Sequence, residues 1–514
     1  AVLFASTASA QLDEPACVGT ERPDPGRPDL VAEREAFGFH DEEVVICSPG
    51  YERATHLGAR LWVPRGCEEP RSCPGVLIAH GFAFSKEFTF ADMQNAANRG
   101  FVVLSYDVRG HGASGDQVGL MGREEIADQA AVLAWFHEHV GPTKVGVYGI
   151  SQGGSHAVMA AIFNCSPGRA AEFLAGDDFP DASCDIDRWV DAIVPVQAPT
   201  TLDPADGVCP TFGIEAVPES RFNLALTRLA LRCATRGTPL EEAAVTATEP
   251  LPAFDFGPSD YLRPDRAGRI DVPAYLVTSF FDRLVLPQNV TRLYEALAAR
   301  SDYGHDLRLT ISNDGHGAVG GNFAVLNDVF TWLEGPLKDG APPFRDAPVA
   351  IAQEWEGNAF RLEEAWPIPD TTTRRWFLSG TESEANGRLV AQPSESEPPD
   401  EMRNVPVVSS PPSVPFTEFV NQITASTSGS GVPLVRLVYR TDPLPEMLEI
   451  TGLPEVSIWL SSSNEGGAGQ GQLHVSLSEI GGDGQVTEFA RNRRGRIDLG
   501  PEPIEIAFPL TVSS

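Results

Sequence analysis

The sequence predicts an α/β domain with a mostly parallel sheet, followed by a separate β-sandwich. In the first two thirds of the chain, short apolar runs alternate with segments of helical period, which is typical of strands and helices that build a parallel sheet. After Trp332 the helical period ends, and apolar residues alternate with polar ones at period two, which indicates antiparallel strands. A linker rich in proline and glycine begins at Gly340 and separates the two patterns.

The elements of the predicted parallel sheet are apolar runs that end in polar or glycine-rich turns. Strands are expected at residues 57–63, 75–79, 101–106, 145–150, 193–197, 275–280 and 307–312. Helices are expected at residues 91–99, 123–139 and 288–300, of which 123–139 has the spacing of an amphipathic helix, and a helix rich in small residues follows Ser151.

The chain is expected to have four parts. Residues 1–10 are predicted to be the remnant of a signal peptide, and residues 11–42 an arm that lies on the surface. The α/β domain is expected at residues 43–340, and the C-terminal β-sandwich at residues 346–514. Within the α/β domain, the alternation of strands and helices is interrupted at about 200–270, where we expect a helical cap over the site.

The composition restricts the class of partner. The chain has 514 residues, a formal net charge of -33 and 42% hydrophobic residues, which is the composition of a folded globular protein. An acidic surface argues against nucleic acids and anionic membranes as partners, because both bind a positive face. No apolar run reaches the roughly 18 residues that a spanning helix needs, so no membrane span is expected.

The first residues indicate export from the cytoplasm. An apolar run is followed by the small residues Ala8-Ser9-Ala10 before Gln11, as at the cleavage site of a secretory signal. An ordinary frayed tail rich in alanine and serine is the alternative. We therefore expect a secreted or periplasmic protein.

The eight cysteines are expected to form disulfides in such a compartment. None of them shows the C-x-x-C spacing of a zinc site. Eight cysteines allow about 105 connectivities, and short pairings such as Cys67 with Cys73 and Cys165 with Cys184 are favoured.

The segment Val145–Gly154 predicts a nucleophilic serine. A short apolar run leads directly into Gly149-x-Ser151-x-Gly153, the pattern of a strand that turns sharply into a helix with a serine at the apex. The two glycines are needed because a Cβ two positions before or after the serine would collide in so tight a turn.

A serine needs a base to take its proton, and the imidazole base needs a carboxylate to fix its tautomer. In α/β-hydrolases these groups follow in the order serine, acid, histidine, each on a loop after a strand. His316 follows the last apolar strand and is the predicted base, and Asp282 follows the strand before it and is the predicted acid. For Asp282 the alternative is a helix cap or a partner of Arg283, and Asp314 is the less favoured acid.

The tetrahedral intermediate needs two preorganised N–H donors. One is expected from the backbone of Gln152, directly after the nucleophile at a helix N-terminus. The other is expected from the backbone of Phe82, in the loop after the strand 75–79, although Phe82 could instead be a pocket wall. His80 and His111, at strand ends on glycine-rich loops, are expected to serve turn structure or to line the pocket. No metal or organic cofactor is implied.

These pieces, in this order and followed by a β-sandwich, resemble the cocaine esterase and X-Pro dipeptidyl-peptidase family of α/β-hydrolases. The resemblance covers roughly residues 45–510. It is carried by the segments at 149–154, 107–110 with Gly115, 281–282, 315–316, 437–444 and 450–452. The resemblance implies an α/β-hydrolase fold, serine-hydrolase activity and a C-terminal jelly-roll domain. Bacterial cocaine esterase places a tyrosine hydroxyl in the oxyanion hole, whereas this chain has Phe82, so the substrate preference of that enzyme does not carry over.

The expected function is a secreted serine hydrolase that cleaves carboxylic esters through a Ser-His-Asp triad and an acyl-enzyme. Its substrate would be a small-molecule ester or a short peptide-like molecule. One alternative is an X-Pro dipeptidyl-peptidase or α-amino-acid ester or amide hydrolase, in which Asp206, Glu215 and Glu219 could hold a substrate ammonium. An inactive hydrolase fold that acts as a binding protein is the alternative from another class.

Overall fold

The protein has two compact units, and each is described by itself. Among the described residues, the first unit extends to Glu364 and the second begins at Ala365. The computed structural model describes residues 39–50, 53–82, 84–116, 118, 122–163, 189–200, 264–280, 282, 285, 287–317, 323–338, 340, 347–353, 359–369, 371–383, 386–393, 437–445, 450, 452, 454–461, 469–480, 486–499, 502–509 and 511–512.

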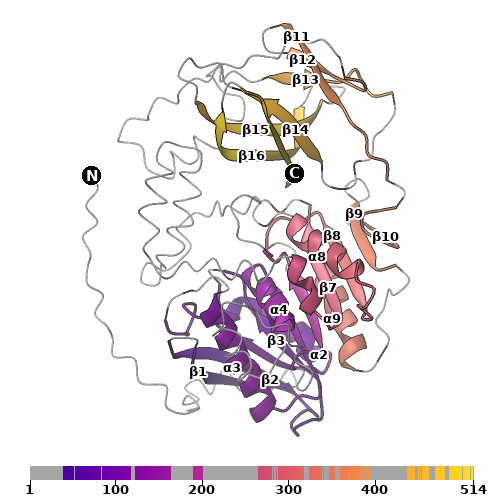
Figure 1. The fold of residues 1–514 in the computed structure, drawn as a ribbon. Helices are drawn as coiled ribbons and strands as arrows, with labels where there is room; N and C mark the ends of the chain where they lie inside the picture. Colours follow the sequence, from indigo (N-terminus) through magenta and orange to yellow (C-terminus); the bar gives the residue numbers. More distant parts are fainter. Residues whose placement is uncertain are drawn as a thin grey trace, which may run out of the picture. The chain divides into compact units, whose positions relative to one another are not determined.

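The first unit is built on one sheet of ten strands in the order β1-β2-β4-β3-β5-β6-β7-β8-β9-β10 (Figure 1). The strands are β1 (Phe39–Ser48), β2 (Thr55–Pro64), β3 (Gly75–Ala79), β4 (Val102–Tyr106), β5 (Val145–Ile150), β6 (Ala192–Val196), β7 (Ala274–Ser279), β8 (Leu307–Ser312), β9 (Val349–Gln353) and β10 (Ala359–Glu363). Strands β3 to β9 pair in parallel, while β1, β2 and β10 join the sheet antiparallel. The predicted mostly parallel sheet is confirmed.

Two predicted boundaries differ from the observed sheet. Residues 39–42, expected in the surface arm, begin β1, which pairs with β2 over its whole length. Strands β9 and β10 lie in the segment assigned to the sandwich, yet they extend the sheet of the first unit. In both places the added strand forms hydrogen bonds with the backbone N–H and C=O groups of a neighbouring strand. Without it, these groups would be unpaired at the edge of the sheet.

The helices of the first unit cover the sheet. They are α2 (Phe90–Asn98), α3 (Arg123–His139), α4 (Gln152–Ile162), α8 (Gln288–Ala298) and α9 (Phe323–Leu337), with the short 3-10 helices η1 (Lys86–Thr89) and η6 (Pro264–Arg269). Apolar residues of α2 and α9 form one buried cluster with strand residues such as Trp62, Ile78 and Tyr148. Helix α4 packs against β5 and β6 and also contacts α3. The predicted cap at 200–270 lies outside the described residues, except for its two ends.

The parallel strands all end at the same edge of the sheet. The loops after β3, β5, β6, β7 and β8 therefore meet there, although they are separated by up to some 230 residues in sequence. This edge is where the functional residues of an open α/β sheet are expected.

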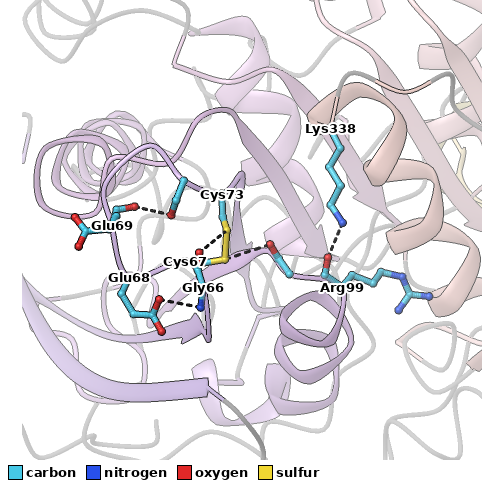
Figure 2. Close-up of a disulfide and its surroundings, with 9 residues drawn as sticks. Gly66, Cys67, Glu68, Glu69, Cys73, Arg99 and Lys338 are labelled. Carbon is cyan, nitrogen blue, oxygen red and sulfur yellow. Dashed lines mark hydrogen bonds between the residues drawn. A yellow bond between two sulfur atoms is a disulfide. The ribbon is translucent and has the colours of Figure 1, made fainter.

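A disulfide joins Cys67 and Cys73 in the connection between β2 and β3, as the sequence analysis favoured (Figure 2). The two Cα atoms lie 5.4 Å apart, and the Sγ of Cys67 lies 3.8 Å from the carbonyl oxygen of Gly100. Cys47 is also disulfide-bonded. The other favoured pair, Cys165 and Cys184, lies outside the described residues.

The second unit is rich in strands. A three-stranded sheet contains β11 (Phe377–Ser383), β12 (Asn386–Val390) and β13 (Val438–Arg440), and β14 (Glu455–Leu460) pairs with β17 (Ile504–Pro509). A further sheet contains β15 (Gly469–Ile480), β16 (Val486–Leu499) and β18 (Thr511–Val512). All of these pairs are antiparallel except β12 with β13. Val456, Ile458 and Leu460 are half-buried while their neighbours in β14 are exposed, which is the predicted period of two.

Within the described parts of both units, no helix has the length and apolar character that crossing a bilayer would require.

Candidate active site

Ser151 occupies the sharp turn between β5 and α4. Its backbone has φ 59° and ψ -120°, a conformation that residues other than glycine rarely adopt. A Cβ at Gly149 would lie 2.2 Å from the carbonyl oxygen of Gly153, so the turn does require glycine at this position. The backbone N–H of Ser151 donates to the carbonyl oxygen of Val196, at the end of the neighbouring strand, at 2.8 Å. The strained turn is therefore tied to the sheet.

His316 lies between Ser151 and Asp282. Its Nε2 is 2.9 Å from the Oγ of Ser151, and its Nδ1 is 2.7 Å from the Oδ2 of Asp282. Both distances are within the range of a hydrogen bond. The structure thus brings together the three residues that the sequence singled out as nucleophile, base and acid, although 165 residues separate Ser151 from His316.

The carboxylate of Asp282 is fully buried, and each of its two oxygens has a hydrogen-bond partner. One oxygen contacts His316, and the other accepts the backbone N–H of Val285 at 2.8 Å. The alternative role of Asp282 as a helix cap does not fit, because the residue before α8 is Pro287. Asp314 is the less favoured candidate for the acid. Its backbone carbonyl oxygen accepts a hydrogen bond from the hydroxyl of Ser279.

The two predicted oxyanion residues lie in segments that are next to the nucleophile. Gln152 is the first residue of α4, so its backbone N–H belongs to the positive end of a helix. Phe82 follows Gly81, and a Cβ at Gly81 would lie 3.5 Å from the Cβ of Ser151. The loop after β3 therefore runs beside Ser151. The ring of Phe82 packs edge-on against His111, with the ring centroids 5.5 Å apart.

Two histidines support the loop that contains Phe82. The Nδ1 of His80 donates to the carbonyl oxygen of Gly81 at 2.7 Å, and its Nε2 accepts the backbone N–H of Val108 at 2.9 Å. Burial and the neighbouring His111 lower the pKa of His80 to about 3, so its ring is neutral and Nε2 is free to accept. Burial also lowers the pKa of His111. These histidines serve turn structure, one of the two roles expected for them.

The segment 107–110 also stabilises the loop after β3. Asp107 is fully buried; it accepts the backbone N–H of Lys86 at 2.7 Å and forms an ion pair with the Lys86 ammonium at 2.8 Å. Arg109 is equally buried and donates to Asp128 on α3 at 2.7 and 2.6 Å. A buried charge is tolerated only with such partners. The motif at 107–110 thus holds β4, α3 and the loop after β3 together.

Exposed aromatic rings lie next to this loop. The rings of Phe84 and Phe88 have centroids 4.4 Å apart, and their side chains are 45% and 69% exposed. A Cβ at Gly81 would lie 3.3 Å from the Cδ2 of Phe84, so this ring is close to the nucleophile.

Sequence reasoning did not identify three residues near the site, which are Glu125, His156 and Gln197. The side chain of Gln152 donates to the buried carboxylate of Glu125 at 2.9 Å, and the same oxygen lies 3.0 Å from the Nε2 of His156. Gln197 contacts the loop that contains His316. Glu125 and His156 lie inside helices, where spacing gives no signal for such contacts. Gln197 could have been suspected, because it directly follows β6 at the edge where the catalytic loops meet.

The comparisons with known proteins agree with this architecture. Residues 53–170 match the X-Pro dipeptidyl-peptidase family (S15 family), and residues 344–502 match the X-Pro dipeptidyl-peptidase C-terminal non-catalytic domain. A search among curated protein sequences found no match.

Two solved structures cover almost the whole chain. An α-amino acid ester hydrolase is 16% identical, with a TM-score of 0.62, over 99% of this chain and 90% of the other. An aminopeptidase from the marine sediment archaeon Thaumarchaeota archaeon is 15% identical, with a TM-score of 0.60 and the same coverage. At this identity the likeness shows the fold. Because both parts of its sequence match, the chain belongs to the X-Pro dipeptidyl-peptidase (S15) family of α/β-hydrolases with a β-rich C-terminal domain.

Proposed function

We propose that the protein is a serine hydrolase that cleaves carboxylic esters, with Ser151 as nucleophile, His316 as base and Asp282 as the acid that orients it. The observation that carries the proposal is the position of His316, with Nε2 2.9 Å from the Ser151 hydroxyl and Nδ1 2.7 Å from the Asp282 carboxylate. This is the geometry in which an imidazole can take a proton from the nucleophile while a carboxylate stabilises the imidazolium.

In the proposed mechanism, the Oγ of Ser151 attacks the carbonyl carbon of the ester and its proton passes to the Nε2 of His316. The imidazolium is stabilised by Asp282 through the Nδ1–H bond. His316 then gives the proton to the leaving alcohol, which departs and leaves an acyl group on Ser151. A water molecule, deprotonated by His316, attacks the acyl carbon, and His316 returns the proton to the Oγ of Ser151 as the carboxylic acid is released.

The charge on the tetrahedral intermediate would be held by the backbone N–H groups of Gln152 and Phe82. Support comes from the start of α4 at Gln152 and from the position of Gly81 beside Ser151. Donors that are already in place are worth most where water is excluded, and removing one typically costs about 3 kcal/mol of transition-state stabilisation.

The alternative substrate class is peptide-like. The matched family is named for X-Pro dipeptidyl-peptidases, and the two solved structures are an α-amino acid ester hydrolase and an aminopeptidase. Cleavage of X-Pro or α-amino-acid substrates is therefore the second candidate. The three carboxylates weighed for ammonium binding, Asp206, Glu215 and Glu219, lie outside the described residues.

Parallel assays test the choice between these substrates. We expect p-nitrophenyl butyrate to be cleaved with a higher kcat/KM than an X-Pro p-nitroanilide. Cleavage of the anilide at a comparable or higher kcat/KM would overturn the ester preference. In either case Ser151→Ala should abolish turnover, since both reactions need the nucleophile.

A binding protein with an inactive hydrolase fold is the alternative from another class. A fluorophosphonate probe distinguishes it, because the probe labels a serine only when a base activates it. We expect labelling of the folded protein that is lost in Ser151→Ala and after heat denaturation. Absence of labelling in the folded wild type would favour the binding protein.

We also propose that the protein acts outside the cytoplasm. The disulfide between Cys67 and Cys73 supports this, because such bonds persist in oxidising compartments. Fractionation of the source cells, followed by thiol alkylation with and without reduction, tests the proposal: a cytoplasmic protein with free thiols at these cysteines would contradict it.

A further inference from the structure

The side chain of Gln197 contacts the backbone on both sides of His316. Its Nε2 donates to the carbonyl oxygen of Gly315 at 3.1 Å, and its Oε1 accepts the backbone N–H of Gly317 at 2.8 Å. Gln197 is fully buried. One amide group therefore pairs with the residue before His316 and with the residue after it.

The backbone of Gln197 is itself held in an unusual conformation. Its φ is 47°, in the left-handed region that non-glycine residues seldom occupy. Its N–H donates to the carbonyl oxygen of Val277 on β7 at 2.7 Å, and the preceding carbonyl, of Val196, accepts the N–H of Ser151 at 2.8 Å. The end of β6 thus contacts the turn of Ser151 through Val196 and the loop of His316 through Gln197. Such strain persists where the surroundings impose it, and it is commonest at functional sites.

Besides Gln197, the hydroxyls of Ser279 and Ser312 contact the backbone of the His316 loop, both at Asp314, whereas Gln197 contacts the two glycines that flank His316. Glycine precedes and follows His316, and Gly317 has a φ of 76°. Apart from its chain neighbours, a Cβ at Gly315 or Gly317 would meet no atom of the described residues within 4 Å, so the space beside these two Cα atoms is open there. Glycine has the largest conformational freedom of any residue. Asp282 orients the ring of His316, but a hydrogen bond to the ring leaves the backbone of the loop undetermined.

We propose that Gln197 is a positioning residue that fixes the distance between His316 and Ser151 by holding the backbone of the His316 loop against the end of β6. The inference rests on the proposed function of the triad. Gln197 itself does not touch the reacting atoms; it acts through His316. A base that is displaced by about 1 Å can cost on the order of 100-fold in rate, so a residue with this role should affect turnover more than substrate binding.

Three variants of the full chain test the role. Gln197→Ala removes both hydrogen bonds and keeps the strained φ, whereas Gln197→Gly removes both and relieves the strain. Gln197→Glu keeps an oxygen for the N–H of Gly317 but replaces the donor to Gly315 with an acceptor. All three are assayed with p-nitrophenyl butyrate, and active molecules are counted by complete labelling with a fluorophosphonate.

We expect kcat per active molecule to fall by about 10- to 100-fold in Gln197→Ala and Gln197→Gly, with KM within about twofold of wild type. The rate of fluorophosphonate labelling should fall by the same factor, because this reaction also needs the base. Gln197→Glu should lose at least as much, because its buried carboxylate still accepts the N–H of Gly317 but repels the carbonyl oxygen of Gly315. If Gln197→Ala is poorly folded, Gln197→Gly still decides, since it removes the amide without leaving a Cβ at the strained position.

Thr200→Val is the matched control. Thr200 is also fully buried near the end of β6, and its hydroxyl donates to the backbone carbonyl of Asn289 at 2.9 Å, away from the His316 loop. This variant should lower the melting temperature and leave kcat per active molecule at the wild-type value. A merely structural Gln197 would behave in the same way.

The proposal is overturned if the Gln197 variants lower only the melting temperature or the number of active molecules, with kcat per active molecule within twofold of wild type. Failure of the proposed function looks different: Ser151→Ala would then retain hydrolysis, or the wild type would not label at all.

Discussion

The carbonyl oxygen of Ala79 lies so close to Gly153 that a Cβ on Gly153 would be 2.0 Å away from it. Ala79 is the last residue of β3, and Gly153 is in the first turn of α4. Both partners are backbone, so neither can rotate out of the way. This close approach brings the N-terminus of α4, where Gln152 lies, against the loop that contains Phe82.

Gly153→Ala should therefore separate α4 from β3 and disturb both proposed oxyanion donors. We expect a loss of about 3 kcal/mol or more in the free energy of unfolding, measured by urea denaturation, and at least a tenfold loss of kcat in the folded fraction. Gly304→Ala is the control, because a Cβ there meets no atom within 4 Å. Wild-type kcat in Gly153→Ala would contradict the importance of the contact.

Asp282→Asn should leave the site folded but inactive. The carboxamide is isosteric, yet it cannot stabilise an imidazolium and can favour the wrong tautomer of His316, so we expect kcat to fall by about 10³- to 10⁴-fold. Asp314→Asn tests the competing acid and should change kcat by less than about threefold. Steady-state kinetics with p-nitrophenyl butyrate measure both, and a larger loss in Asp314→Asn than in Asp282→Asn would reverse the assignment.

Asp92→Asn should change how stability depends on pH. Burial raises the pKa of Asp92 to about 7 in the folded state, from a usual value of 3.8, despite the hydrogen bond from Tyr148. The folded protein then holds a proton that the unfolded chain releases, so the stability from Asp92 is complete below pH 3.8 and is lost as the pH rises to about 7. An asparagine accepts the Tyr148 hydroxyl and does not titrate.

The measurement is the difference in unfolding free energy between Asp92→Asn and wild type at several pH values. This difference should grow in favour of the variant by about 1.4 kcal/mol per pH unit between pH 4 and 7. His80, whose pKa is lowered to about 3, acts in the opposite direction, but it is present in both proteins and cancels. Glu138→Gln, on the exposed face of α3, makes the same substitution of a carboxamide for a carboxyl group and is the control. A difference that is constant with pH would refute the prediction.

Cys67→Ser with Cys73→Ser should destabilise the protein without changing its turnover. The disulfide closes a short loop with a sequence separation of 6, for which the loss of chain entropy in the unfolded state predicts about 2 kcal/mol. The bond precedes the start of β3, while the proposed site lies at the opposite end of that strand. Thermal unfolding should show a lower melting temperature, and kcat at 25 °C should equal that of wild type. A tenfold fall in kcat would show that the bond supports the site.

The sequence by itself determined the fold class and the three proposed triad residues. Alternating apolar runs identified the parallel strands, because buried strands and amphipathic helices differ in hydrophobic period. Ser151 was recognisable from the two glycines that its turn requires, and Asp282 and His316 from their positions after successive strands. These signals are local: each is carried by a few neighbouring residues.

The tertiary structure alone decided how those residues are held. The contacts of Gln197 with Gly315 and Gly317 span 118 and 120 residues, and the contact of Gln152 with Glu125 joins two helices. No periodicity or motif in the sequence marks such partners. A hydrogen bond between distant segments depends on which strand ends lie next to one another at the edge of the sheet. The same reason explains why β9 and β10 extend the sheet of the first unit, since the local sequence of a strand does not say which sheet it joins.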